Sequence, residues 1–337
     1  MLLRRPSYYS RFRCIAGSCP DSCCHLWQVE LSPETVEKYL SLPGALGEQL
    51  RAAIRREEDR YYFVNTHDRC PMWREDGLCG LQAQLGEEYL SPVCRSFPRI
   101  QQDYGTFTEE LLELSCPECA RLLLMNPHFT MEETTVPGGE APDYDGEVME
   151  ILLASRPVAL ALLDSDLPIA HRLAALLLYS YQVQSAVDGG ELTEFDAEGA
   201  IAAITPFLQP GSPADIAEFY ASLEGLTAQW PQLLSQAAAP RWEESSLALA
   251  RYGIWRYWLQ AVSDFDLAGR MKMVVLSCIL CASLPGDRCR VLQLYAKEIE
   301  NDADNLDAIL DNAFAHSALT DAKLLYLLLK GESYDPV

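Results

Sequence analysis

The chain has little positive charge for its length. Its 337 residues include 26 Lys and Arg against 49 Asp and Glu, which gives a formal net charge of −23. Binding nucleic acid requires an excess of cationic side chains that neutralise phosphates, and anionic membrane surfaces repel an acidic protein. The composition therefore argues against nucleic-acid partners and against association with membranes.

Long hydrophobic runs are also missing. No uninterrupted apolar stretch reaches the roughly 18 residues of a spanning helix, although 49% of the residues are hydrophobic, which is enough for a full core. The arginines near the start are not followed by the apolar segment of a secretory signal. We therefore expect a cytoplasmic protein whose cysteines stay reduced.

Residues 131–143 mark a boundary, because they are rich in Pro, Gly and Thr and poor in apolar side chains. The sequence predicts a Cys-rich module over residues 1–130, a linker or loop over 131–143 and an α-helical domain over 144–337. Charge divides at the same place, with a net of −4 over residues 1–130 and −19 over the remainder. The acidic second part either presents a solvated surface or attracts a basic protein partner.

The second part is predicted to be helical throughout. Apolar residues recur at three- and four-residue spacing, Ala and Leu dominate, and alternating β-branched strands are nearly absent. Ser212 before Pro213 matches a helix start. The predicted helices cover residues 144–163, 168–187, 196–208, 213–237, 242–267, 269–284, 287–314 and 317–329.

The first part is expected to combine short helices with irregular loops. Helices are predicted over residues 33–39, with Ser32 as the cap, and over 45–58, 80–90 and 107–126. Residues 14–24 and 70–79 look irregular, as loops around a bound metal often are. The fold class that follows is mainly α, with a Cys-rich metal-binding module packed on a C-terminal α-helical domain.

Cysteines are the most unusual feature of the composition. There are 12 of them, and nine lie between Cys14 and Cys119. Thiols a few residues apart can turn toward one ion or cluster, and distant ones can close the site across the fold. The groups are Cys14, Cys19, Cys23 and Cys24; Cys70 and Cys79; Cys94; and Cys116 with Cys119.

In a reducing compartment such groups indicate metal ligands, with buried free thiols as the alternative. Nine cysteines are more than one zinc ion needs, and adjacent Cys23 and Cys24 are unusual for a tetrahedral zinc site. We therefore expect an iron–sulfur cluster in preference to zinc. His25 and His67 lie close enough in sequence to cysteines to replace a thiolate or donate to one. The pair Cys278 and Cys281 lies in an apolar helix and is predicted to be buried thiols.

Four segments of the Cys-rich part carry a recognisable pattern: residues 12–27 (FRCIAGSCPDSCCHLW), 69–82 (RCPMW to GLCGLQ), 85–99 (LGEEYLSPVCRSFPR) and 114–118 (LSCPE). Together they resemble the FliB family, the flagellin lysine N-methylases. The Cys-rich part also looks like the broader CxxCxxCC group of zinc- or iron-chelating domains. The resemblance closely covers residues 8–125, whereas the remainder matches only in being helical and similar in length.

The resemblance implies an enzyme that methylates lysine ε-amines of a protein substrate, flagellin, with S-adenosylmethionine as methyl donor and a 4Fe–4S cluster. It implies nothing about oligomeric state. Eight thiols exceed the four ligands of one such cluster, and Cys119 stands where the family is expected to have another residue. The cysteines that match the family pattern are Cys14, Cys19, Cys23, Cys24, Cys70, Cys79, Cys94 and Cys116.

Two common designs of S-adenosylmethionine enzymes are absent from the sequence. There is no G-x-G-x-x-G, and the Gly pairs at 138–139 and 189–190 follow no predicted strand. The cysteine spacing of radical enzymes is absent too, because Leu26 occupies the place of the third cysteine. A donor site would therefore have to be formed jointly by the cluster and the helical body.

Arg95, Arg99, Trp27 and Tyr89 are the candidate donor-binding residues. The two arginines either clamp a carboxylate of the donor or neutralise a thiolate-bound cluster. The aromatic rings could hold a sulfonium or a methylated ammonium by cation–π contact, or they only pack around the metal loops. No general base can be assigned. The alternatives to a methylase are a non-catalytic iron–sulfur or zinc scaffold that senses redox state and an oxidoreductase that uses the cluster for electron transfer.

Overall fold

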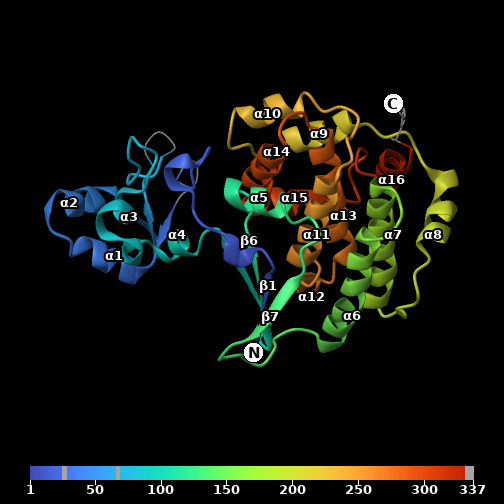
Figure 1. The fold of residues 1–337 in the computed structure, drawn as a ribbon, viewed down its shortest axis with the longest axis horizontal. Helices are drawn as coiled ribbons and strands as arrows, with labels where there is room; N and C mark the ends of the chain where they lie inside the picture. Colours follow the sequence, from blue (N-terminus) through green and yellow to red (C-terminus); the bar gives the residue numbers. More distant parts are fainter. Residues whose placement is uncertain (25–28, 66–68, 331–337) are drawn as a thin grey trace.

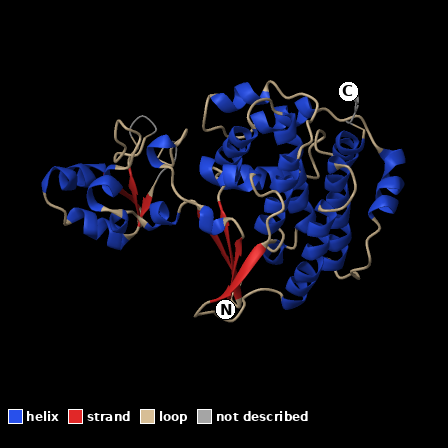
Figure 2. Ribbon diagram, in the orientation of Figure 1, coloured by secondary structure: helices blue, strands red, loops and turns tan. Residues whose placement is uncertain are grey.

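The computed structural model describes residues 1–24, 29–65 and 69–330. Helices make up most of it, as predicted, but two small β-sheets lie in the first part of the chain (Figures 1 and 2). A small lobe stands beside a larger helical body in Figure 1, and the longer strands lie where the two meet. Among the described residues, no helix is both long and apolar enough to cross a membrane.

The small lobe, residues 29–65 and 69–98, contains an antiparallel sheet of order β2–β4–β3 and short helices. The predicted cap of the first helix is confirmed, because the Thr35 amide donates to the Ser32 hydroxyl at 3.2 Å. The elements are β2 (Glu30–Leu31), α1 (Pro33–Leu40), α2 (Gly44–Ala53), β3 (Ile54–Glu57), β4 (Arg60–Phe63), α3 (Gly80–Leu85) and α4 (Pro92–Ser96).

The helix predicted over residues 45–58 is too long. It ends at Ala53, and the chain continues directly into β3. Glu58 has a positive φ of 52°, which closes a tight turn so that β3 pairs with β4 in the register Ile54 to Phe63. The polar sequence of residues 55–60 fits a helix surface and a hairpin equally well, and strand pairing decides between them.

The helix predicted over residues 107–126 is wrong in its first half. Residues 107–112 form β6 (Phe107–Leu112), a central strand in a sheet of order β5–β6–β1–β7. Most of its side chains are buried on both faces, so the period of two that marks a half-exposed strand is hidden. The other elements here are β1 (Leu2–Pro6), β5 (Arg99–Asp103), α5 (Pro117–Leu124) and β7 (Met131–Thr135).

The sheet draws together segments that are distant in sequence. β1 runs parallel to β6, with Leu2 opposite Phe107, and antiparallel to β7, with Leu2 opposite Thr135. Residues 131–135 of the segment expected to be a linker are therefore a paired strand. The predicted domain boundary stays a prediction. The sheet does show that the first strand of residues 1–135 pairs directly with the last one.

Buried apolar side chains form two clusters. The smaller includes Tyr39, Leu50 and Phe63 of the small lobe. The larger joins Tyr8, Phe12 and the strand β6 to the helical body. Thus β6 and α5, with Ile100 of β5 and Met131 of β7, share a core with the C-terminal helices, and the small lobe contains a core of its own.

Residues 144–330 are helical, as predicted, and the Ser212 cap is confirmed by a 3.2 Å bond from the Ala214 amide. Three predicted helices are interrupted, for example at 222–228, where the amides of Leu226 and Thr227 donate to buried Glu298. The elements are α6 (Gly146–Leu163), α7 (Ile169–Val187), α8 (Ala197–Ile204), α9 (Pro213–Ala221), α10 (Gln229–Leu234), α11 (Glu244–Tyr257), α12 (Ala261–Asp264), α13 (Leu267–Ser283), α14 (Arg288–Tyr295), a π-helical turn (Ala296–Glu300), α15 (Ala303–Asn312) and α16 (Asp321–Leu329).

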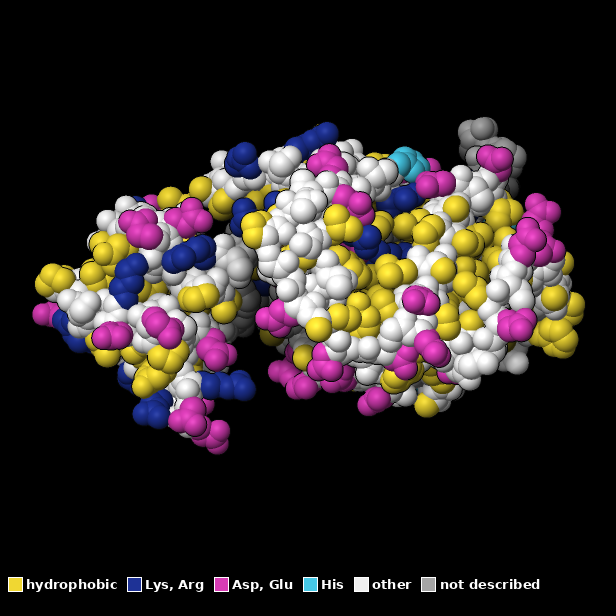
Figure 3. Space-filling model, turned by 90° about the horizontal axis from the view of Figure 1, so that it is seen from below, with side chains coloured by type: hydrophobic (Ala, Val, Ile, Leu, Met, Phe, Trp, Pro, Cys, Tyr) yellow, Lys and Arg dark blue, Asp and Glu magenta, His cyan; other side chains and the backbone are white. Residues whose placement is uncertain are grey.

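The acidic charge of the body is spread out. In the view from below, acidic side chains lie scattered over the face of the helical body between apolar and neutral ones (Figure 3). That distribution on this face fits a solvated surface better than one concentrated docking patch.

Candidate metal centre

Four of the predicted thiols meet where the loop of residues 14–24 contacts the small lobe. The Cys24 sulfur is in hydrogen-bond contact with the sulfurs of Cys23, Cys70 and Cys79. We call these four residues the four-thiol set. Backbone bonds hold the two loops together, because the Cys70 amide donates to the Cys24 carbonyl at 2.9 Å. Thiols 46 or more residues apart in sequence thus become neighbours.

The local folds of Cys70 and Cys79 direct amides toward their sulfurs. Cys79 is the cap of α3, and bonds from the Cys24 thiol and from the amides of Gln82 and Leu81 lower the pKa of Cys79 to about 6. Bonds from the Cys24 thiol and the Met72 amide likewise lower the pKa of Cys70. The thiolate is the form that binds metals, so this geometry favours the ligand form at two positions.

Cys94, in α4, lies beside the four-thiol set. Burial, together with the nearby thiols of Cys70, Cys79 and Cys23, raises its pKa to about 11, although the Ser91 hydroxyl opposes this. Cys94 is thus placed near the set but in a protonated state.

The remaining predicted thiols form a second group. Cys116 contacts Cys119 at the start of α5, and Cys19 lies near both Cys116 and exposed Cys14. The second group adjoins the four-thiol set, because Cys116 lies within electrostatic reach of Cys23. Over residues 1–24, 29–65 and 69–330, no three His, Cys, Asp or Glu side chains are arranged as they would be around a bound metal ion.

The loop that carries Cys19, Cys23 and Cys24 is fixed to the helical body through Asp21. Its carboxylate accepts from Lys297 at 3.0 Å and from Gln293 at 2.8 Å, and Gln293 also donates to the Ser115 carbonyl at 3.0 Å. Lys297 projects from the π-helical turn, a geometry often found at functional sites. Sequence reasoning missed this contact, since nothing local pairs Asp21 with a residue 276 positions away.

The candidate donor-binding residues are already engaged with the protein. The Lys38 ammonium lies over the Tyr89 ring, 3.8 Å from the centroid of that ring. Arg95 donates to the carbonyls of Glu88 and Leu90 at 3.1 and 3.2 Å. Arg99, at the first position of β5, lies 5.6 Å from the Phe12 ring. Trp27, His25 and His67 lie outside the described residues.

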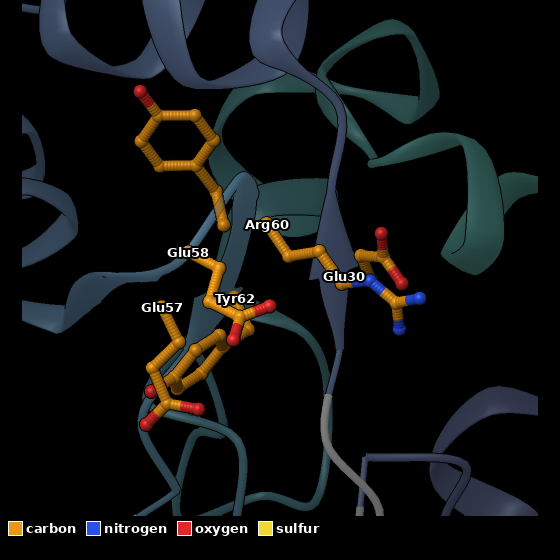
Figure 4. A pocket seen from close by; sticks show the side chains of 6 residues that line it. Glu30, Glu57, Glu58, Arg60 and Tyr62 are labelled. Atoms are coloured by element: carbon orange, nitrogen blue, oxygen red, sulfur yellow. The ribbon is translucent and has the colours of Figure 1, made fainter.

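A hollow of about 580 Å³ that the sequence did not indicate opens beside the small sheet. It is lined by Glu30, Glu57, Glu58, Arg60, Tyr61 and Tyr62 (Figure 4). Its charged side chains are exposed, so their carboxylates stay hydrated and carry no distinctive chemistry. The predicted burial of Cys278 and Cys281, by contrast, is confirmed, at 0% and 3% exposure.

Comparison with known proteins gives matches to part of the chain. The lysine-N-methylase of Salmonella typhimurium (strain LT2) is 30% identical over 139 residues, which are 39% of this chain and 35% of that protein. The lysine-N-methylase of Salmonella choleraesuis is 29% identical, also over 139 residues and the same fractions of the two chains. The flagellar biosynthetic protein FliU of Salmonella muenchen is 30% identical over 129 residues, 36% of this chain and 76% of that protein. The match thus spans about a third of the two methylases. No protein-family model and no solved structure matches the chain.

Proposed function

This chain belongs to the FliB family of lysine-N-methylases, and from that membership we propose that it transfers a methyl group from S-adenosylmethionine to lysine side chains of a protein, with flagellin as the expected substrate. Family membership is the observation that carries the proposal. The relatives are named as a lysine-N-methylase and as a flagellar biosynthetic protein.

We further propose that the four-thiol set holds the metal centre. Four cysteine sulfurs are the donor set of both 4Fe–4S clusters and structural zinc, and amide bonds to Cys70 and Cys79 suit thiolate ligands. We favour the cluster over zinc, because the family resemblance implies it. A bound cluster would supply a redox-active iron centre and would join the loops around Cys24 and Cys70.

The methyl donor would lie where the small lobe meets the body. Of the candidate residues, Arg99 is the better carboxylate partner, because Arg95 already satisfies two backbone carbonyls. Tyr89 and Trp27 remain candidates for contact with the sulfonium. Transfer to lysine requires a neutral amine aligned with the donor, so a nearby base has to remove its proton.

The activity is tested by incubating anaerobically purified protein with methyl-labelled S-adenosylmethionine and purified flagellin. We expect label on lysine side chains, located by peptide mass spectrometry. Arg99→Met should raise the KM for the donor about tenfold, the cost of one lost charge-assisted bond, whereas Arg95→Met should change it little. Protein that retains its metal but leaves lysine unlabelled would favour the non-catalytic redox scaffold.

The metal site is tested by iron, sulfide and zinc analysis of two cysteine variants. Cys24→Ser should lose most of the bound metal, because Cys24 contacts the other three sulfurs. Cys14→Ser is the matched control, since Cys14 is exposed and belongs to the second group, and it should retain metal. Equal loss in both variants would contradict the assignment of the four-thiol set.

A further inference from the structure

Two cysteines outside the four-thiol set also touch. The sequence Cys116-Pro117-Glu118-Cys119 opens α5, with Cys116 as the cap and Cys119 in the first turn. The two sulfurs are in hydrogen-bond contact, and the Cys119 amide donates to the Cys116 carbonyl at 3.0 Å. The helix start thus holds both thiols in a fixed turn.

The environments of the two thiols differ. Cys116 is partly exposed, and its sulfur accepts from the amides of Cys119 and Glu118 at the positive end of the helix. Cys119 is fully buried. An accessible thiol in contact with a buried thiol three residues further on, at the start of a helix, is the arrangement in which one sulfur attacks a disulfide and the other resolves it.

We propose that Cys116 and Cys119 form a redox-active dithiol that closes reversibly into an intramolecular disulfide. The inference is independent of methyl transfer. Cys116 then acts as the attacking thiol and Cys119 as the resolving thiol.

The oxidant is a low-molecular-weight disulfide. The Cys116 thiolate attacks one of its sulfurs, forming a mixed disulfide and releasing the other half as a thiolate. Cys119 then loses its proton and attacks the Cys116 sulfur, which releases the second half. Two protein thiols are oxidised to one disulfide, and one small disulfide is reduced to two thiols, which take up the two protons.

The chain contains an internal comparison with the same spacing. Cys278 and Cys281 lie in the middle of α13, where both are buried, and Cys278 donates to the Ser246 carbonyl at 3.5 Å. This pair lies inside the helix, where backbone amides bond to the preceding turn. We expect it to stay reduced where the first pair oxidises.

The test equilibrates the metal-loaded full chain, under argon, in mixtures of reduced and oxidised glutathione, followed by acid quenching, alkylation with N-ethylmaleimide and trypsin digestion. Cleavage after Arg99 and Arg121 gives a peptide, residues 100–121, whose only cysteines are Cys116 and Cys119. With more oxidised glutathione this peptide should lose both labels together and become lighter by two hydrogen atoms. The peptide of residues 273–288, with Cys278 and Cys281, should keep both labels.

A trapping variant checks the order of the two thiols. In Cys119→Ser the mixed disulfide on Cys116 cannot be resolved, so a glutathione adduct should accumulate on residues 100–121. Cys116→Ser should gain no adduct there, because Cys119 is buried. The proposal is overturned if residues 100–121 of the unaltered protein stay doubly labelled in every mixture, or if Cys116 is recovered bonded to Cys19 or Cys289.

Discussion

Glu109 illustrates how a single residue depends on a partner far along the chain. It lies on β6 with 0% of its side chain exposed, and its carboxylate accepts two bonds from Arg156, at 2.8 and 2.7 Å. Arg4 of the neighbouring strand adds a contact at 3.3 Å. A buried carboxylate is tolerated only when it is paired in this way.

Replacing Arg156 should therefore be strongly destabilising. Arg156→Met would leave the Glu109 carboxylate buried with only Arg4 beside it, and we expect a loss of about 3–5 kcal/mol in the free energy of unfolding. Urea denaturation followed by circular dichroism measures it. The double variant Glu109→Leu with Arg156→Met removes both charges and should recover most of the loss; an unchanged midpoint in Arg156→Met would contradict the argument.

At the scale of elements, a glycine sets the distance between α11 and α13. A Cβ at Gly253 would lie 2.6 and 2.7 Å from the two Cγ atoms of Val274. Both helices belong to the larger core, so neither can move without disturbing its other contacts. The sequence alone indicates a glycine in a helix but not the reason for it.

Gly253→Ala should lower the stability although alanine favours helix. The gain in helix propensity is about 1 kcal/mol, whereas overpacking costs about 1–3 kcal/mol, so we expect a net loss of about 1 kcal/mol. Thermal unfolding would show a lower Tm. Val274→Ala is the control background, because it makes room for the new methyl group, and there Gly253→Ala should cost less or stabilise.

The π-helical turn after α14 fixes the cysteine loop. Lys297, with 11% of its side chain exposed, bonds both Asp21 oxygens at 3.0 Å. Lys297→Met removes this contact and should lower the free energy of unfolding by about 2 kcal/mol. It should also speed amide hydrogen exchange in residues 14–24. Arg290→Met is the milder control, since Arg290 is 40% exposed and lies 3.4 Å from Asp21. Equal exchange in both variants would show that Lys297 does not hold the loop.

At the scale of the molecule, the two cores are of unequal size. The core of the small lobe contains about ten buried side chains among the described residues, which is few for an independent fold. The larger core extends from Tyr8 to Leu328. The small lobe should therefore depend on its proposed metal centre more than the body does.

Removing the metal should loosen one part of the molecule. After treatment with a chelator under argon, we expect faster amide exchange in β2–β4 and α1–α3 and unchanged exchange in α6, α7 and α13. Mass spectrometry of peptides resolves the two regions. Cys24→Ser should give the same pattern without chelator. A uniform change over the whole chain would contradict the prediction that the small lobe depends on the metal more than the helical body does.

Most of the helices could be predicted because they rest on local patterns. Three- and four-residue spacing of apolar side chains, with caps such as Ser32 and Ser212, marks helices by itself. The strand β6 could not be predicted in this way. Its side chains pack into the larger core with helices that follow much later, so its local sequence lacks the alternation of an exposed sheet.

The amino-acid order by itself determined a mainly helical chain with clustered thiols, because helix periodicity and cysteine spacing act over a few residues. Only the tertiary structure decided that Cys24 contacts Cys70 and Cys79, that Cys116 contacts Cys119 instead, and that Asp21 bonds Lys297. Most of these contacts join loops separated by tens to hundreds of residues. Their partners are selected by how the sheet and the two cores pack, which no short segment of sequence encodes.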